Sequence, residues 1–359
     1  RRLWRIMFEL KNILEKGGLS RLFCFLGILV LVSCNSLNIE EERNEVYNGR
    51  TMGTKYNIVF AQHPVTSQKE VDSVLRFVNE VFSTYDSTSY ISSINHPEVL
   101  EHYINRFPLE IRKQHNAEFQ RLMKMSYVVY TNTQGVFDPS AATLFNLWGF
   151  GESNKSNPTD EEISFALTSV GFEKYKKLVF SEKNQAIEID NEINLNFNAI
   201  AKGYGTDKVA ELLLKNGDSS FMVEIGGEVR TSGHSPSNEK WIIGVNIPES
   251  GSSQQSVLDT VQLSDMSIAT SGNYRNFYYD SIGNIIGHTI DPRTGYPVIN
   301  ELKSATVFHK SCAMADAYAT AAMVLGVEKF KNIIVKDTNL EALLVFQKGD
   351  SIIRERVYD

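Results

Sequence analysis

The segment from Gly287 to Pro297 holds three side chains that together can do chemistry on a phosphate. His288 can donate or accept a proton near neutral pH. Asp291 can cap a turn or hold a cation, and Arg293 carries a planar guanidinium that binds two phosphate oxygens at once. A proline and a glycine in the same segment are typical of a turn with a fixed backbone. The combination favours a phosphate-handling turn, and a polar hairpin turn without chemistry is the alternative.

A second pair of oxygen-bearing side chains lies in an alanine-rich segment, residues 311–325, which we expect to be a helix with Ser311 as its N-cap. Asp316 and Thr320 are four residues apart, so they lie on one face of that helix. A carboxylate and a hydroxyl are oxygen ligands of the kind that Mg²⁺ prefers. The alternative is a polar helix face on which Thr320 bonds back to a backbone carbonyl.

An anion site is indicated between Asn196 and Gly205, where a predicted strand runs into a predicted helix. Backbone N–H groups at the start of a helix attract anions, and Lys202 adds a full positive charge there. Two glycines so close to the helix start would weaken it unless another group approaches the backbone. The glycine spacing does not match a P-loop. An ordinary strand-to-helix turn is the alternative.

Aromatic and small polar residues elsewhere offer a wall for a ring system. An aromatic run with glycines, residues 144–151, could form such a wall. The alternative is that its aromatic residues fill the core and its glycines form a turn. A tyrosine ends a predicted helix, and a small polar segment precedes the phosphate-handling turn. The candidate residues of this group are Tyr85, Val136, Phe137, Asp138 and Ser271.

Composition narrows the class of protein. The chain has 359 residues, 42% of them hydrophobic and 22% charged, which is typical of a globular protein with one large domain or two closely joined ones. A formal net charge of −7 argues against nucleic acid as a partner, because duplex binding usually needs a basic face. The serine hydrolase elbow, the His-Glu-x-x-His zinc motif and an N-terminal dinucleotide-binding glycine motif are absent from the sequence.

The first 48 residues indicate export rather than a fold. A basic stretch, residues 1–21, precedes an apolar run, residues 22–32, that is shorter than the roughly 20 residues needed to span a bilayer. This pattern fits a signal peptide. The run ends in a sequence similar to a bacterial lipobox, in which Cys34 would carry the lipid, and an uncleaved anchor is the alternative. We therefore expect a lipoprotein signal peptide over 1–33, a polar tether over 34–48 and a globular domain over 49–359, lipid-anchored on the periplasmic side of a bacterial membrane.

Interleaved helix and strand signals predict an α+β fold with mixed, largely antiparallel sheets and helices between the strands. Helices are predicted from apolar spacing and capping residues at 69–85, 118–131, 159–171, 199–216, 311–325 and 327–335. Strands are predicted from alternation and turn residues at 54–61, 177–180, 185–190, 193–197, 221–225, 241–247, 257–263, 268–271, 285–290 and 305–308, with a closing hairpin of 342–346 and 352–356.

Taken together, these elements resemble the ApbE family, the FAD:protein FMN transferases of the bacterial periplasm. The resemblance covers about residues 47–350 and rests on the order and spacing of short motifs. The motifs are Met52-Gly53-Thr54, Ser83-Thr84-Tyr85, Phe137-Asp138-Pro139, residues 147–151, residues 199–204, Gly226-Gly227, Thr270-Ser271-Gly272, residues 288–295, and Ala315-Asp316-Ala317 with Thr320. The chain departs from the family pattern at Asn196, where many members have Asp, and at residues 140–143, where Thr-Val-Gly-Pro is usual.

The resemblance implies FAD as donor and Mg²⁺ as cofactor. A Thr or Ser hydroxyl of an acceptor protein would attack the phosphorus on the FMN side of FAD, and AMP would leave. His288 is then the candidate general base, with Asp291 as an alternative base or an orienting group. The carbonyl of Ala199 and the side chains of Asp316 and Thr320 would hold Mg²⁺. The FAD site would comprise Met52, Tyr85, Val136, Phe137, Asp138, Asn196, Lys202 and Ile290, with Ser271 and Arg293 as further polar contacts.

The resemblance also implies acceptors with the motif Asp-x-x-Ser/Thr-Gly-Ala-Ser/Thr. Such motifs occur in exported subunits of sodium-translocating NADH:quinone oxidoreductases and RNF-type complexes. Three rival interpretations stay open. The same site could use water as the nucleophile and act as an Mg²⁺-dependent FAD pyrophosphatase. The chain could instead be a flavin-binding lipoprotein without catalysis, or a structural surface lipoprotein.

Overall fold

The computed structural model of the chain describes residues 45–150, 157–175, 180–181, 186–187, 194–246, 257–272, 277–279, 285–287 and 289–358. The expected signal peptide, Cys34 and His288 lie outside these ranges. Within them, every helix is too short or too polar to cross a bilayer.

One large antiparallel sheet organises the fold and confirms the predicted α+β class. Its eight strands follow the order β1-β2-β5-β6-β9-β12-β13-β14, and each neighbouring pair is antiparallel. The strands are β1 Val46–Thr51, β2 Thr54–Phe60, β5 Phe221–Ile225, β6 Glu228–Ser232, β9 Ser267–Gly272, β12 Leu302–His309, β13 Glu341–Lys348 and β14 Ser351–Val357. Three further antiparallel pairs are β3 Phe180–Ser181 with β4 Ala186–Ile187, β7 Trp241–Asn246 with β8 Val257–Leu263, and β10 Phe277–Tyr279 with β11 Ile285–Gly287.

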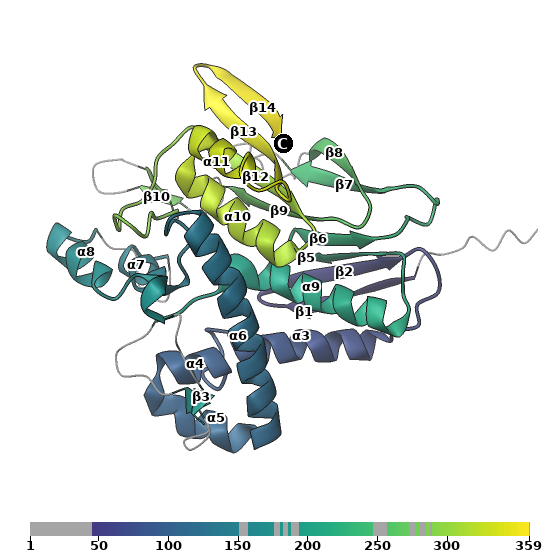
Figure 1. The fold of residues 1–359 in the computed structure, drawn as a ribbon, viewed down its shortest axis with the longest axis horizontal. Helices are drawn as coiled ribbons and strands as arrows, with labels where there is room; N and C mark the ends of the chain where they lie inside the picture. The colour runs from purple at the N-terminus through teal and green to yellow at the C-terminus, as the bar shows by residue number, and fades with distance from the viewer. Residues whose placement is uncertain are drawn as a thin grey trace, which may run out of the picture. The chain divides into compact units, whose positions relative to one another are not determined.

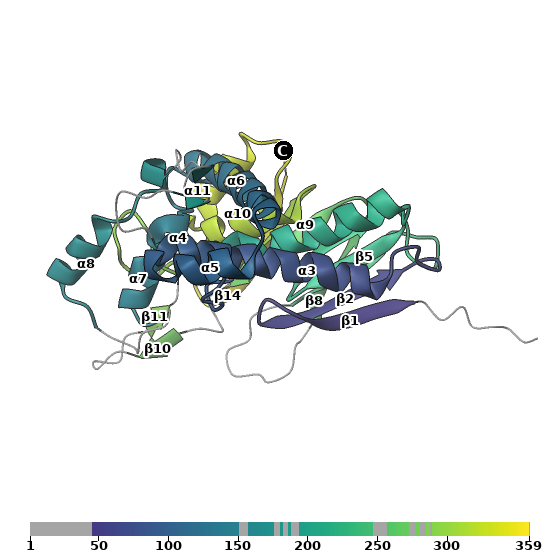
Figure 2. The same ribbon diagram turned by 90° about the horizontal axis from the view of Figure 1, so that it is seen from below.

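The two faces of the sheet are covered by different elements because successive strand residues point to opposite sides. Ala269 and Leu344 pack into the core that includes α10 (Cys312–Leu325). Their neighbours Ile268 and Leu343 pack instead against apolar residues of the β7–β8 pair. Helices α3 (Gln68–Phe82) and α9 (Asn198–Asn216) cover β2 and β5 on one side, as Figures 1 and 2 show.

A second group of helices lies beside this sheet layer. The long helix α6 (Leu109–Asn132) packs against α3, α4 and α10, and its buried aromatic and apolar residues join the core under α10. The remaining helices are α4 Tyr90–Asn95, α5 Leu100–Arg106, α7 Ala142–Leu147, α8 Asp160–Leu167 and α11 Val327–Ile334, with 3₁₀ turns at Pro97–Val99, Pro139–Ala141 and Phe172–Tyr175.

Most predicted helices are confirmed, and the predicted capping details also hold. Ser311 caps α10 by accepting a bond from the backbone of Met314, and Thr159 forms a capping box with Glu162 at the start of α8. Helix α6 begins at Leu109, earlier than the expected 118. Its first half buries Arg112 and His115, and these polar residues hide the apolar spacing from a sequence reading.

The structure corrects several predicted strands. Residues 194–197, expected to be the end of a strand, form no strand, because Asn196 turns the chain by accepting a bond from the backbone N–H of Asn198. The strand expected over 285–290 ends at Gly287. Strand β6 was missed because Glu228 and Arg230 interrupt its apolar pattern. Strand β1 begins at Val46, so residues 46–48 of the expected tether belong to the sheet.

Candidate functional site

The candidate site lies at a close contact between α9 and α10. A Cβ atom on Gly203 would lie 2.3 Å from the carbonyl oxygen of Cys312, so only glycine allows this contact between the helices. The backbone N–H of Gly203 donates to Oδ2 of Asp316 across the same contact, at 3.0 Å. The glycine that looked unfavourable near a helix start therefore brings the predicted metal-binding helix against the predicted anion-binding one.

Lys202 and two buried carboxylates form the charged centre of this contact. The Nζ atom of Lys202 lies 3.2 Å from Oε1 of Glu228 and 3.8 Å from Oδ1 of Asp316. The side chains of Glu228 and Asp316 are each 5% exposed, whereas that of Lys202 is 31% exposed. Lys202 was expected in the flavin site and Asp316 in the metal site, and the structure brings both together with Glu228.

Burial and mutual charge set the protonation of these three groups. Burial raises the pKa of Asp316 and of Glu228, and Lys202 partly offsets that rise. Burial would lower the pKa of Lys202, but the carboxylates of Asp316 and Glu228 outweigh it and raise that pKa. Lys202 therefore carries its charge, and one ammonium faces two carboxyl groups.

The residues around Asp316 fit a further cation. Oε2 of Glu228 is buried and has no hydrogen-bond partner among the described residues, and an unpaired buried carboxylate oxygen is unfavourable unless a cation or water reaches it. Thr320 lies one helical turn beyond Asp316, and its hydroxyl is 3.4 Å from that of Ser271 on β9. Ala199 lies in the first turn of α9. Among the described residues no group of three or more His, Cys, Asp or Glu side chains forms a metal cluster, so a cation here would depend on a mixed set of oxygen ligands.

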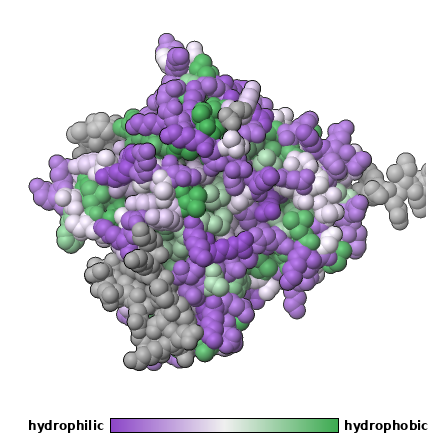
Figure 3. Space-filling model, in the orientation of Figure 1, coloured by the Kyte–Doolittle hydropathy of each residue, from purple (hydrophilic) through white to green (hydrophobic). Residues whose placement is uncertain are grey.

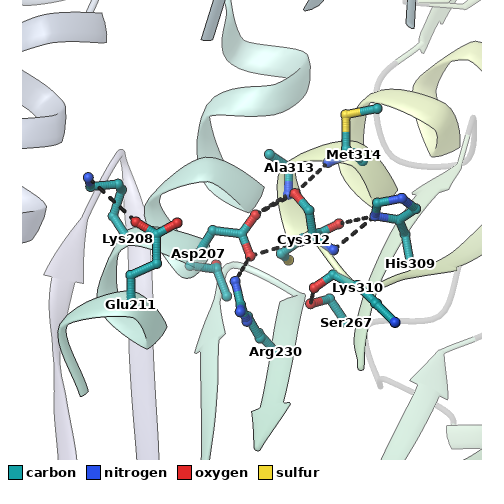
Figure 4. A network of polar contacts seen from close by, with 12 residues as sticks. Asp207, Lys208, Glu211, Arg230, Ser267, His309, Lys310, Cys312, Ala313 and Met314 are labelled. Atoms are coloured by element: carbon teal, nitrogen blue, oxygen red, sulfur yellow. Dashed lines mark hydrogen bonds and ion pairs between the residues drawn. The ribbon is translucent and has the colours of Figure 1, made fainter. Parts of the chain in front are cut away.

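A buried hydrogen-bond network fixes the start of α10 against α9 (Figure 4). Asp207 on α9 accepts bonds from the hydroxyl of Ser311 at 2.6 Å and from the backbone N–H groups of Cys312 and Ala313, each at 3.0 Å. Arg230 on β6 donates to the same carboxylate at 2.5 Å. One carboxylate thus satisfies the free N–H groups of the helix start and fixes the direction of α10. Asp207 was not predicted from the sequence, although it lies only five residues beyond Lys202 on α9.

The phosphate-handling turn is built around a pair of opposite charges. Nε and Nη2 of Arg293 donate to Oδ1 and Oδ2 of Asp291, at 2.9 and 2.7 Å. Burial would raise the pKa of Asp291, but the bonds from Arg293 outweigh it and hold that pKa below its usual range. Trp148 donates from its indole N–H to the carbonyl of Gly295 at 2.8 Å and ties the turn to α7. Both oxygens of Asp291 therefore already accept bonds from Arg293. This arrangement suits a residue that orients Arg293 better than a general base.

The segment that follows α6 meets both the turn and the start of α9. A Cβ atom on Gly135 would lie 3.8 Å from Cγ of Arg293, and the backbone N–H of Asn196 donates to the carbonyl of Pro139 at 2.8 Å. Asp138 accepts bonds from the hydroxyl and backbone of Ser140 and from the backbone of Phe172. Arg293, the 135–139 segment and the start of α9 are therefore neighbours through short contacts.

Several residues proposed for the flavin site have side chains that point into the core. Val136, Phe137 and Ile290 are each 3% exposed or less, so in this structure they could contact a ligand mainly through their backbone. Met52 is half-buried against α9, where its methyl group would meet a Cβ atom on Gly205. Tyr85 is 84% exposed in the turn after α3. Glu228 was missed because only the two glycines before it were singled out.

Comparison with known proteins supports the sequence resemblance. The family model described as "ApbE family" matches residues 52–344. The chain is 34% identical over 337 residues to the FAD:protein FMN transferase of Vibrio cholerae serotype O1, covering 92% of this chain and 94% of the relative. It is 30% identical to the FAD:protein FMN transferase of Haemophilus influenzae, covering 91% and 94% of the two chains.

Solved structures share the fold. The flavin transferase ApbE from Vibrio cholerae superimposes with a TM-score of 0.69 at 30% identity, covering 88% of this chain and 97% of that one. The apo form of the Pseudomonas stutzeri flavinyl transferase ApbE gives a TM-score of 0.70 at 27% identity, covering 88% and 95%. The sheet and helix arrangement described above is therefore that of these proteins.

Proposed function

The chain belongs to the ApbE family, and on that premise we propose that it transfers FMN from FAD to a Ser or Thr hydroxyl of an acceptor protein. Its curated relatives are named FAD:protein FMN transferases, so the enzyme class is that of a transferase. The observation that carries the proposal is the buried group of Lys202, Glu228 and Asp316 at the close approach of α9 and α10. Such a charged group inside the fold is suited to binding a pyrophosphate together with a cation.

The cation in this proposal is Mg²⁺, held by the side chains of Asp316 and Thr320 and the carbonyl of Ala199. The buried carboxylate of Asp316 and the half-buried Thr320, which lies one turn further along α10, support this choice. When bound, Mg²⁺ supplies positive charge to the pyrophosphate oxygens, where negative charge grows during phosphoryl transfer.

The chain's own residues bind and orient the flavin nucleotide. The side chain of Lys202 is 31% exposed, so it can offer its ammonium to a phosphate oxygen. Arg293, 40% exposed, keeps part of its guanidinium open while Asp291 holds the rest. Asn196 and Ser271 bring neutral polar groups, and Met52, Tyr85 and the 136–138 segment bring the apolar and backbone contacts that an isoalloxazine ring needs.

The reaction breaks the phosphoanhydride bond of FAD and forms a phosphoester bond to the acceptor. The acceptor hydroxyl oxygen bonds to the phosphorus on the FMN side of FAD, and the bond from that phosphorus to the bridging oxygen breaks. AMP leaves with the bridging oxygen, and the hydroxyl proton passes to a base. We assign that base to His288 from the sequence, since its imidazole can take a proton near neutral pH and it adjoins the turn that holds Arg293.

Two variants test the assignment of roles. Asp316→Asn should abolish Mg²⁺-dependent release of AMP, because the cation loses the carboxylate of its ligand set. His288→Ala should slow FMN transfer by about 100-fold or more while leaving FAD binding intact. The release of AMP is followed by chromatography, and FAD binding by flavin fluorescence. Transfer near the wild-type rate in His288→Ala, with activity lost in Asp316→Asn, would rule out His288 as the base.

The rival function is that of an FAD pyrophosphatase, in which water takes the place of the acceptor hydroxyl. One observation favours it. Tyr85, whose ring would have to cover the site in order to exclude water, is 84% exposed in this structure. The two functions differ in the product that contains FMN. A transferase leaves it on the acceptor, and a pyrophosphatase leaves it free in solution.

We further propose that the acceptors are exported proteins with the motif Asp-x-x-Ser/Thr-Gly-Ala-Ser/Thr, such as subunits of sodium-translocating NADH:quinone oxidoreductases or RNF-type complexes. The lipobox-like sequence that ends at Cys34 supports a location on the periplasmic side of a bacterial membrane, with a lipid anchor. The net charge of −7 argues against nucleic acid as the partner.

A further inference from the structure

Lys202 is shared unequally between two carboxylates. Its Nζ lies within hydrogen-bond distance of Oε1 of Glu228, at 3.2 Å, whereas Oδ1 of Asp316 is 3.8 Å away. The second distance is too long for a hydrogen bond. Oδ2 of Asp316 is occupied by the backbone N–H of Gly203, so Oδ1 is the oxygen that stays available to another ligand.

The turn between β5 and β6 fixes this unequal arrangement. Gly226 adopts a left-handed backbone with φ of +61°, and a Cβ atom there would lie 3.4 Å from Cδ of Lys202. The lysine stem therefore runs directly past the turn. Glu228 follows two residues later as the first residue of β6, paired with Ile225, and its side chain is directed inward with 5% exposed.

The position of the Lys202 ammonium matters because this group can compete with a metal ion for Asp316. An ammonium that bonded directly to Oδ1 of Asp316 would neutralise that oxygen and repel a divalent cation. Held on Glu228, the same ammonium leaves Oδ1 free and still contributes its charge at the edge of the site. Oε2 of Glu228 has no partner among the described residues, so this carboxylate meets Lys202 through Oε1.

We propose that Glu228 is a positioning residue that keeps the Lys202 ammonium off Asp316 and thereby sets the affinity of the site for its divalent cation. The inference rests on the proposed function, because it takes Asp316 as a metal ligand. Glu228 itself acts through Lys202 and does not need to contact the metal.

The test measures metal binding rather than activity. Full-length, flavin-free protein in detergent is titrated with Mn²⁺, and free Mn²⁺ is followed by electron paramagnetic resonance. Glu228→Gln should weaken Mn²⁺ binding by about 10- to 100-fold, the range typical for partners that orient a metal ligand. Lys202→Met should bind Mn²⁺ at least as tightly as the wild type, since the competing ammonium is gone.

A double variant separates positioning from ligation. In Glu228→Gln combined with Lys202→Met, Mn²⁺ affinity should return to near the wild-type value, because no ammonium is left to move onto Asp316. Binding as weak as in Glu228→Gln alone would overturn the proposal, since Glu228 would then act on the metal without Lys202. Wild-type binding in Glu228→Gln would overturn it as well.

Two controls keep this test apart from a failure of the metal site or of folding. Glu224→Gln removes a charge on the neighbouring strand, where the carboxylate bonds to Gly227 and Asn57, and should leave Mn²⁺ binding unchanged. Asp316→Asn should abolish binding, and wild-type binding in that variant would overturn the proposed metal site itself. Equal urea midpoints without metal establish that the variants are folded.

Discussion

The pair formed by Asp291 and Arg293 limits what each side chain can do. Both oxygens of Asp291 accept bonds from the guanidinium of Arg293, and the lowered pKa of Asp291 makes it a weak proton acceptor. The carboxylate is thus committed to orienting Arg293, whose remaining N–H groups can face a phosphate. Of the two roles that sequence alone left open for Asp291, base or orienting group, this geometry favours the orienting one.

Replacing Asp291 by Asn tests that assignment. Asn keeps the shape of the side chain and one acceptor oxygen. If Asp291 only orients Arg293, the substitution should slow FMN transfer by less than about tenfold. Loss of a general base typically slows a reaction by about 100-fold or more. The rate is measured at saturating FAD and acceptor. A loss as large as that in His288→Ala would contradict the orienting role.

At the residue scale, sequence predicted the reactive groups better than their surroundings. Helical spacing placed Asp316 and Thr320 on one face, and the structure has them one turn apart on α10. Glu228 could not be found in this way, because its nearness to Lys202 depends on how α9 packs against β6. Sequence also could not show that Val136, Phe137 and Ile290 are buried in the core. An apolar residue in a motif has the same sequence pattern whether it lines a pocket or fills the core.

Among the elements, the α9–α10 contact depends most on a single residue. Asp207 holds the start of α10 and pairs with Arg230, and both its oxygens are used. Asp207→Ala should reduce the free energy of unfolding by about 3 kcal/mol or more, because it leaves a largely buried guanidinium and several N–H groups without their partner. Urea unfolding measures the change, with the m-value expected to stay the same.

Glu211 provides the matched control for Asp207. It lies one turn further along α9 and pairs with Arg121 at the surface, at 2.6 Å. Because exposed ion pairs contribute about 0–1 kcal/mol, Glu211→Ala should change stability little. Equal losses in the two variants would show that Asp207 does not act through the buried network.

The helical part of the structure should respond to acid through His115 on α6. Burial, aided by the charge of Arg106, lowers the pKa of His115 from 6.5 to about 4. Between these values the unfolded chain binds a proton that the folded chain does not, so stability falls as the pH falls through this window. The slope contributed by this one group reaches at most about 1.4 kcal/mol per pH unit.

Urea unfolding at a series of pH values checks this expectation. His115→Phe removes the titrating group, so its stability should fall less steeply than that of the wild type between pH 6.5 and 4, whatever its absolute stability. Identical slopes for the two proteins would mean that His115 does not carry this pH dependence.

The elements that could be predicted from sequence are those with a regular apolar pattern or clear caps. Helices α3, α9 and α10 and the β13–β14 hairpin fall in this group. Helix α6 was predicted only from residue 118 because its buried Arg112 and His115 look like surface residues. Strand β6 was missed for the same reason, because Glu228 and Arg230 also look like surface residues in the sequence. In the structure they pair with Lys202 and Asp207.

For the molecule as a whole, the N-terminal segment carries the expectation that the protein is anchored to a membrane. On the face in Figure 3, hydrophobic residues are scattered among hydrophilic ones rather than gathered into one broad patch. We propose that the segment around Cys34, which lies outside the described residues, provides stable attachment to a membrane. A lipid on this cysteine would supply it, since buried acyl chains contribute about 0.8 kcal/mol per methylene group.

Mass spectrometry of the N-terminal peptide tests the anchor. In a bacterial host the mature protein should begin at Cys34 and carry the added mass of the lipid, and Cys34→Ala should carry none. Membrane and soluble fractions of wild-type cells provide the accompanying readout. A mature wild-type protein with an unmodified Cys34, or one that begins upstream of it, would contradict the lipid anchor.

We propose that the whole molecule moves FMN from FAD to another protein. The most direct test of this proposal uses the chain from residue 35 onward, mixed with FAD, Mg²⁺ and a peptide that bears the acceptor motif, together with a matched peptide whose acceptor hydroxyl is replaced by alanine. Mass spectrometry follows the peptides, and chromatography follows AMP and FMN. The account predicts that the first peptide alone gains one FMN in a phosphoester bond, with AMP released and no reaction when Mg²⁺ is chelated. Free FMN and AMP beside an unmodified peptide, or FAD left intact, would contradict it.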